Sequence, residues 1–188
     1  MARISVQTED FDTGAEIAAL TAGRTDIGGI GCFIGTVRAQ LGPKDAAASP
    51  PVGDPGVEDP GVAGMVAPGV APGVAPGVAP VVAMTLEHYP GMTERAIERI
   101  VASAEARWPL LGCTVIHRVG TLRVGENIVL VIAASSHRQA ALDATAFLID
   151  WLKTKAPFWK REESVDGQGA WVEAREADDE AAARWQSL

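Results

Sequence analysis

The sequence has few cysteines, few aromatic side chains and no long apolar run. No stretch of about 18 uninterrupted apolar residues is present, so we do not expect a membrane-spanning helix. No apolar secretory segment follows Met1 to Ser5, and we expect a cytoplasmic protein. The two cysteines, Cys32 and Cys113, are too few for a zinc site or a disulfide framework, so we expect two buried thiols.

Basic residues are also scarce. The chain has 16 Lys and Arg against 24 Asp and Glu, a formal net charge of −8, which argues against a nucleic-acid binder. The glycine-rich run from Gly28 to Arg38 lacks the spacing of a dinucleotide-binding loop, and no metal or cofactor is expected. With 188 residues and 47% hydrophobic composition, the chain is long enough to bury one sizeable core. We therefore expect a single domain spanning residues 1–188, interrupted by one insertion.

The expected insertion covers about residues 43–82 and is rich in Pro, Gly, Val and Ala. The tetrapeptide Ala-Pro-Gly-Val recurs at Ala67, Ala71 and Ala75. Proline at every fourth position removes backbone donors, and glycine raises the entropy cost of ordering the chain. The segment is therefore predicted to be a flexible loop. Long surface insertions cost little closure entropy, so a neutral expansion is favoured over a partner-docking arm.

Outside the insertion, hydrophobic periodicity indicates an α+β fold with a mostly antiparallel sheet and flanking helices. Strands are expected at residues 3–8, 28–38, 83–89, 114–119 and 127–134, and the last two look like a hairpin. Helices are expected after Thr13, over residues 93–108 and after Ser136. The glycines of the second strand suggest that it bends or that another backbone approaches it closely.

Two helix starts and one helix end can be placed from local chemistry. Thr13 with Glu16, and Ser136 with Gln139, have the spacing of capping boxes. Pro157 disfavours helical geometry at the preceding residue, so the last long helix should end between Lys153 and Ala156. The chain beyond Pro157 is expected to fold back and bring Lys160 towards Lys153.

Cations gather locally inside this acidic chain. Four basic residues and no acid lie between Lys153 and Arg161, and His137 with Arg138 stands at the expected start of the same helix. Such a reversal of sign suggests a site for an anionic ligand. The alternative is a pair of lysines that stabilises the negative end of a helix dipole.

Four separated motifs make the functional prediction specific. They are the Gly28 to Arg38 run, Leu86 to Glu94, the stretch from Ser136 to Glu162 and Gly169 to Arg175. In this order they resemble the large, catalytic subunit of molybdopterin synthase. The resemblance covers nearly all of the chain outside the insertion and implies the hammerhead-like α/β fold of that family.

The resemblance also implies a reaction and its partners. A small ubiquitin-like subunit brings a C-terminal Gly-Gly thiocarboxylate, and the large subunit uses it to convert cyclic pyranopterin monophosphate into the dithiolene of molybdopterin. The family arrangement is a homodimer flanked by two small subunits. The substrate-binding residues implied are Thr36, Val37, Arg38, His137, Arg138, Lys153, Lys160, Arg161 and Glu162.

Two lysines are the candidate catalytic residues. A nearby ammonium is needed to stabilise charge on the acyl oxygen as sulfur leaves, and we assign Lys153 to this task. Lys160 is the candidate for proton transfer, because neighbouring cations lower the pKa of a lysine towards neutrality. The division of these two roles is not readable from the sequence. Thr36 departs from the lysine common at that position in the family, which removes one possible phosphate contact.

Two other function classes stay open. In one, the cationic site belongs to a non-catalytic module that binds the C-terminal carboxylate of a partner. A persulfide sulfurtransferase using Cys32 is the other alternative, although an apolar strand favours an inert thiol over a reactive one.

Several remaining polar and aromatic residues are expected to be structural. His88 has no companions at metal-ligand spacing, and the His117-Arg118 dipeptide is followed by no basic cluster. The tryptophans expected to anchor the core or an interface are Trp108, Trp151 and Trp171, whereas Trp159 lies within the basic motif.

Overall fold

The computed structural model describes residues 2–39, 81–165, 167, 169–172 and 176–186. Nearly all of the expected insertion lies outside the described residues. Its last two positions, Val81 and Val82, belong to a strand, which begins two residues earlier than expected.

The first sheet has four strands in the order β1-β4-β6-β2. β1 runs parallel to β4, and the other two pairs are antiparallel. The strands are β1 (Ala2–Gln7), β2 (Gly29–Thr36), β4 (Leu110–Arg118) and β6 (Asn127–Ser135). β2 therefore forms one edge of this sheet, and β6 is its only neighbour among the described strands.

The second sheet is fully antiparallel, in the order β5-β3-β7-β8. Its strands are β3 (Val81–His88), β5 (Gly120–Arg123), β7 (Phe158–Ser164) and β8 (Gly169–Val172). The predicted pairing of 114–119 with 127–134 is confirmed, with His117 opposite Val129. The connection between them is more than a turn, because β5 leaves it to join the second sheet.

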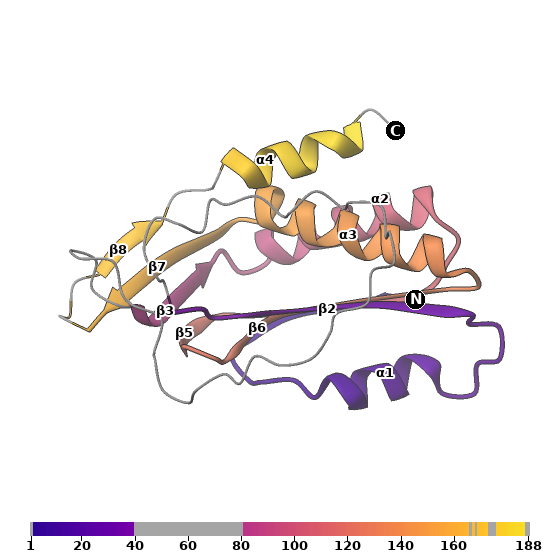
Figure 1. The fold of residues 1–188 in the computed structure, drawn as a ribbon, viewed down its shortest axis with the longest axis horizontal. Helices are drawn as coiled ribbons and strands as arrows, with labels where there is room; N and C mark the ends of the chain where they lie inside the picture. Colours follow the sequence, from indigo (N-terminus) through magenta and orange to yellow (C-terminus); the bar gives the residue numbers. More distant parts are fainter. Residues whose placement is uncertain (1, 40–80, 166, 168, 173–175, 187–188) are drawn as a thin grey trace, which may run out of the picture.

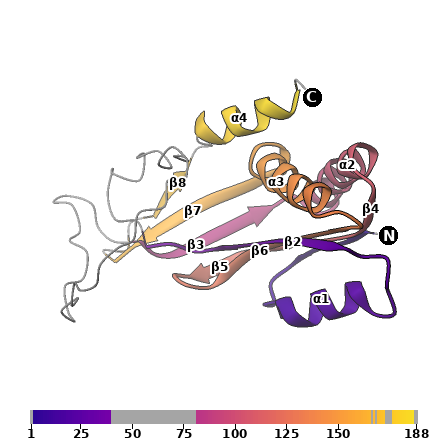
Figure 2. The same ribbon diagram turned by 45° about the vertical axis from the view of Figure 1, so that its right-hand side comes forward.

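Helices cover both faces of the first sheet. α2 and α3 lie on one face and α1 on the other, while α4 lies beyond α3, away from the sheet (Figures 1 and 2). The helices are α1 (Thr13–Thr21), α2 (Met92–Arg107), α3 (Arg138–Lys155) and α4 (Glu176–Ala183), followed by the 3-10 turn η1 (Arg184–Gln186). The α+β class and the mostly antiparallel sheets are thus confirmed.

The main core lies between the first sheet and the α2/α3 layer. α2, expected over residues 93–108, contributes an apolar stripe in which Ile97, Ile100, Val101 and Ala104 are all buried. Phe147 of α3 is almost fully buried and contacts Trp108 edge-on, at a centroid distance of 5.3 Å. Burying a large apolar side chain contributes about 1.5–3 kcal/mol, so this layer is the main source of stability.

The glycines of β2 are explained by the close approach of α3. A Cβ on Gly31 would lie 2.5 Å from the carbonyl oxygen of Ala141, and one on Gly29 would lie 2.9 Å from the Cα of Arg138. No side chain fits in either space. The prediction of a strand approached closely by another backbone is therefore confirmed, and the start of α3 is held against the start of β2.

The predicted end of α3 agrees with the structure, whereas the predicted N-caps of α1 and α3 do not. α3 ends at Lys155, as predicted from Pro157. The N-cap of α1 is Asp12, not Thr13, and its carboxylate accepts a hydrogen bond from the Ala15 N–H at 3.0 Å. The N-cap of α3 is His137 rather than Ser136, without a side-chain cap. Both capping boxes were wrong by one residue.

Candidate active site

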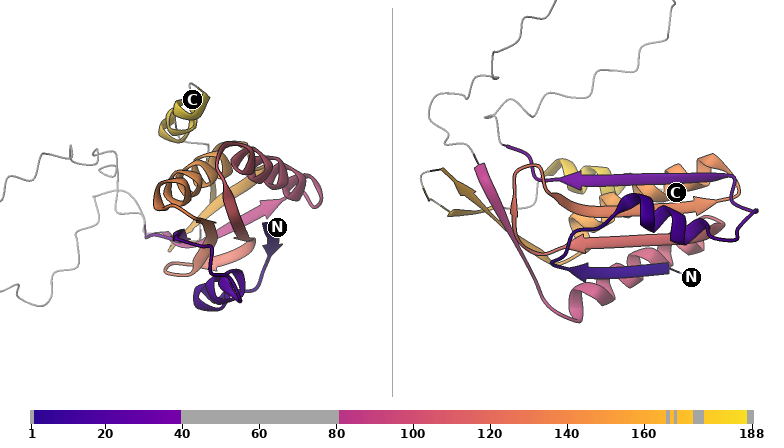
Figure 3. Two further views of the ribbon diagram at one scale, coloured as in Figure 1. Left: turned by 90° about the vertical axis from the view of Figure 1, so that its right-hand side faces the viewer. Right: turned by 90° about the horizontal axis from the view of Figure 1, so that it is seen from below.

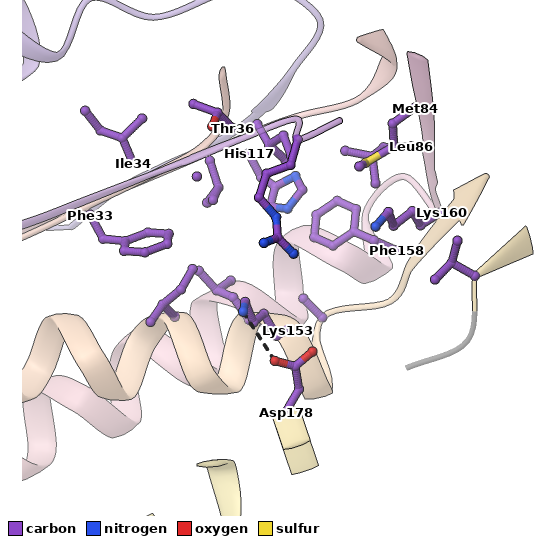
Figure 4. A pocket seen from close by; sticks show the side chains of 18 of the residues that line it. Phe33, Ile34, Thr36, Met84, Leu86, His117, Lys153, Phe158, Lys160 and Asp178 are labelled. Carbon is purple, nitrogen blue, oxygen red and sulfur yellow. Dashed lines mark hydrogen bonds and ion pairs between the residues drawn. The ribbon is translucent and has the colours of Figure 1, made fainter. Parts of the chain in front are cut away.

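A cavity of about 690 Å³ opens where the end of β2, the last turns of α3 and the second sheet meet. Its walls are largely apolar, with Phe33 from β2 and Met84 and Leu86 from β3 (Figure 4). Its charged side chains are Arg38, Lys153, Lys160, Glu162 and Asp178. Three cations from three separate segments therefore surround one apolar pocket, which suits a ring-shaped anionic ligand.

Lys153 reaches the cavity because of its position on α3. Ile149, Leu152 and Ala156 also line the cavity, and this spacing places all four residues on one helical face. The Lys153 side chain is 52% exposed, and its Nζ donates to Oδ1 of Asp178 at 3.2 Å. Asp178 comes from α4, and the sequence analysis did not single it out.

Lys160 and Glu162 lie on the cavity side of β7. Residues two apart on a strand share a face, and here Lys160 Nζ lies 2.6 Å from Glu162 Oε1. Arg161 lies on the opposite face, where it pairs with Glu163 at 2.9 Å and stands opposite Trp171 in the strand register. The expected chain reversal after Pro157 is confirmed, since Lys153 and Lys160 line the same cavity.

The segment after β2 supplies the remaining predicted residues. Thr36 and Arg38 line the cavity, and Val37 between them is buried against Met84, Leu86 and Leu122. The backbone of Val37 donates to the Glu126 carbonyl at 2.9 Å and accepts from the Gly125 N–H at 2.8 Å. Val37 thus anchors the segment that presents its two neighbours to the cavity.

His137 and Arg138 lie elsewhere in the same chain. They stand at the start of α3, whereas Lys153 is in its last turns. At 1.5 Å per residue, the helix separates His137 from Lys153 by about 24 Å. Both residues are exposed, and neither lines the cavity.

Of the two cysteines expected to be buried, only Cys113 is. Cys113 is buried, and burial raises the pKa of its thiol to about 12. Cys32 is exposed, because it sits on an edge strand and α1 packs over Ile116, Leu130 and Ile132 of the two central strands instead. Partial burial still raises the pKa of the Cys32 thiol, and Cys32 does not line the cavity. A raised pKa and a position outside the cavity are the opposite of what a reactive sulfur-transfer thiol requires.

The other side chains expected to be structural divide into two groups. Trp108 and Trp151 pack against Phe147 in the core, as expected. Trp171, which was expected to anchor the core or an interface, is exposed on the second sheet and so is not a core residue, and Trp159 of the basic motif is exposed there as well. His88 lies 3.8 Å from a Glu94 carboxylate oxygen.

The His117-Arg118 dipeptide is structural only in part. Arg118 is buried and donates hydrogen bonds to the carbonyls of Thr8 and Asn127. His117 lines the cavity, which the sequence analysis missed.

Comparison with known proteins identifies the family. Residues 74–155 match the family model described as MoaE protein. The molybdopterin synthase catalytic subunit of Mesorhizobium japonicum is 46% identical over 98% of this chain and 93% of its own length. The chain belongs to the molybdopterin synthase catalytic subunit family. The predicted resemblance is thereby confirmed, and with it the expectation of an enzyme.

Solved structures in this family have the same fold. The molybdopterin biosynthesis MoaE protein from Burkholderia ambifaria matches with a TM-score of 0.68 and 42% identity, covering 99% of both chains. A protein complex of subunits 1 and 2 of molybdopterin-converting factor from Helicobacter pylori matches with a TM-score of 0.55 and 16% identity, over 93% of this chain and 90% of that one. The second likeness concerns the fold alone.

Neither a membrane span nor a metal cluster is found in the part of the chain that the structure describes. None of the helices there is long and apolar enough to cross a bilayer. Within the same residues, no three His, Cys, Asp or Glu side chains come together as ligands for a metal ion.

Proposed function

We propose that this chain transfers sulfur from the C-terminal thiocarboxylate of a small ubiquitin-like subunit to cyclic pyranopterin monophosphate, forming the dithiolene of molybdopterin. The observation that carries the proposal is the cavity in which Arg38, Lys153 and Lys160 surround an apolar pocket. Its volume of about 690 Å³ is in the range of small-molecule sites. The subunit is proposed to act in the cytoplasm.

The three cations divide the work by their chemistry. Arg38 offers a planar fork of donors, which suits the substrate phosphate. Lys153 is a mobile point charge on the cavity face of α3, and it stabilises negative charge on the acyl oxygen of the thiocarboxylate as sulfur leaves. Lys160 moves protons during formation of the dithiolene.

Two carboxylates hold the lysines in place before substrates arrive. Glu162 is only 12% exposed in its side chain and pairs with Lys160, while Asp178 pairs with Lys153. An incoming thiocarboxylate carries the same charge as Asp178 and therefore replaces it as the partner of Lys153. The small subunit itself is proposed from family membership.

A homodimer is proposed because, within one chain, His137 and Arg138 lie far from the basic residues of the cavity. β2 runs from the start of α3, where Gly29 contacts Arg138, to the cavity, where Thr36 lies. Its eight residues span about 26 Å, close to the distance between His137 and Lys153. Two copies with antiparallel β2 edges would place His137 and Arg138 of each copy beside the cavity of the other.

The β2 edge has the surface for this contact. Ile30 and Ile34 are 37% and 43% exposed, and they share a face with the exposed Cys32. Figure 3 shows β2 at the border of the sheet, to one side of α1. An uncovered edge strand with apolar side chains is a preferred place for strand pairing with a second chain.

Subunit mixing tests the shared site. The double variant His137→Ala/Arg138→Ala and the variant Lys153→Ala should each be inactive. Random mixing should restore about a quarter of wild-type activity, because half of the dimers are mixed and each has one intact site. Mixtures that stay inactive, although mixed dimers are detected by mass, would refute a site shared between copies.

Reconstitution tests the function itself. The purified chain, a thiocarboxylated small subunit and cyclic pyranopterin monophosphate should together produce molybdopterin. Tight binding of the small subunit without any product would favour the non-catalytic module. Product formation that needs a persulfide on Cys32 instead of the thiocarboxylate would favour a persulfide sulfurtransferase.

A further inference from the structure

His117 is a histidine of the cavity wall to which no role has been assigned. It lies on β4, next to the end of the strand, and its side chain lines the cavity. Its ring stacks on that of Phe158, with centroids 3.8 Å apart and planes inclined by 15° (Figure 4). This stacking fixes the plane of the imidazole, so both nitrogens have set directions.

The hydrogen bond of one nitrogen determines the state of the other. Nδ1 lies 2.9 Å from the backbone carbonyl oxygen of Arg118. Because a carbonyl oxygen only accepts, Nδ1 carries the proton and Nε2 keeps its lone pair. Burial lowers the pKa of His117 to about 4, helped by the neighbouring His88, so the ring is neutral at pH 7.

Nε2 is open to the cavity. In the part of the chain that the structure describes, no hydrogen bond or ion pair reaches it. It is also not sealed from solvent, since the one buried and unpaired side-chain nitrogen or oxygen among those residues is Trp151 Nε1. The cavity wall therefore presents a neutral acceptor at a fixed position.

Such an acceptor is scarce among the side chains of this cavity. Arg38, Lys153 and Lys160 offer donors only. The carboxylates of Glu162 and Asp178 already hold the two lysines. Apart from the Thr36 hydroxyl, His117 Nε2 is the neutral nitrogen or oxygen acceptor among the side chains that line the described part of the cavity.

We propose that His117 Nε2 accepts a hydrogen bond from an N–H group of the pterin ring and thereby selects and orients that ring. This inference rests on the proposed function. A pterin carries amino and ring N–H donors besides its phosphate, and the cations, which offer donors only, cannot pair with those N–H groups. A site built to pair with a donor discriminates strongly against ligands that lack it. His117 is thus a specificity-determining residue, separate from the three cations of the cavity.

Two substitutions isolate the Nε2 acceptor. In His117→Asn the amide N–H can still donate to the Arg118 carbonyl, but nothing replaces Nε2. In His117→Gln the longer side chain carries an amide oxygen towards the Nε2 position. The control is His88→Gln, a histidine on β3 that stands opposite Phe158 in the strand register and does not line the cavity.

Binding of cyclic pyranopterin monophosphate and of inorganic phosphate is measured without the small subunit, so that no turnover occurs. His117→Asn should weaken pterin binding about tenfold and leave phosphate binding unchanged. His117→Gln should recover part of the loss, and His88→Gln should bind both ligands like the wild type. Equal loss of both ligands, or none, in a folded His117→Asn protein would overturn the assignment.

A nitrogen NMR spectrum of the wild-type protein tests the same contact without any variant. The Nε2 resonance of His117 should shift when the pterin binds and stay in place with inorganic phosphate. A pterin-saturated protein whose Nε2 resonance does not move contradicts the inference alone. Failure of the wild type to bind the pterin at all overturns the proposed function together with this inference.

Discussion

Replacing Lys153 by alanine should separate catalysis from folding. The Lys153 side chain is 52% exposed, and its one described ion pair is with Asp178, itself 28% exposed. Exposed pairs of this kind contribute about 0.2–1 kcal/mol. Lysine and alanine both favour helix, so no further loss of stability is expected from the backbone. For a chain of this size, 1 kcal/mol lowers Tm by about 2–4 °C, and the variant should melt within that interval.

The effect on catalysis should be far larger. Removing one preorganised group that stabilises a developing oxyanion typically lowers kcat by about 10²–10³. The assay is molybdopterin formation at saturating thiocarboxylated partner, with Tm measured on the same preparation. Lys160→Ala, which removes the second candidate catalytic group, should also be severely impaired.

Lys155→Ala is the matched control. Lys155 lies in the same turn of α3, with its Nζ 5.9 Å from the centroid of the Trp151 ring, and it does not line the cavity. An exposed cation–π contact contributes about 0.5–1 kcal/mol, so the control should lose similar stability and keep its activity. Activity of Lys153→Ala within a few-fold of wild type, or equal damage from both substitutions, would refute the reasoning.

Three further changes should have the following results. Cys32→Ser should keep full turnover, because its thiol lies outside the cavity, and a folded but inactive variant in the same assay would favour the persulfide route. Replacing residues 43–80 by a short Gly/Asn turn should leave Tm and turnover unchanged, since the repeat has no titratable side chain to bind an anionic pterin; a tenfold weaker affinity for the small subunit would instead show a docking arm. Phe147→Ala should lower the free energy of unfolding by about 3–5 kcal/mol, as measured by denaturant titration, because its side chain fills the α2/α3 core; a loss below 1 kcal/mol would contradict this view of the core.

The parts of the fold that the sequence predicts well are those set by local chemistry. The stripe from Ile97 to Ala104 specifies the buried face of α2, and Pro157 limits the length of α3. The glycines of β2 required a close neighbour, and α3 is that neighbour. The predicted N-cap of α1 was wrong because Asp12 and Thr13 are both good cap residues, and only the observed backbone distinguishes them.

The parts that the sequence did not predict depend on strand order and distant contacts. Cys32 is exposed because β2 is an edge strand, which its own residues do not specify. Asp178 meets Lys153 across 25 positions of chain, and no local pattern indicates this pairing. The position of Arg161 outside the cavity could have been predicted. Successive side chains of a strand point to opposite faces, so a strand through Lys160, Arg161 and Glu162 must place the arginine on the face opposite to its two neighbours.

The most direct test of the proposed sulfur transfer follows the sulfur itself in a single turnover. The thiocarboxylated small subunit is mixed with an excess of the chain and cyclic pyranopterin monophosphate, and intact mass and dithiolene are measured together. The account predicts that the small subunit exchanges its terminal sulfur for oxygen, and that two small subunits are consumed for each dithiolene formed. Dithiolene formation while the small subunit keeps its sulfur, or loss of that sulfur without any pterin product, would contradict it.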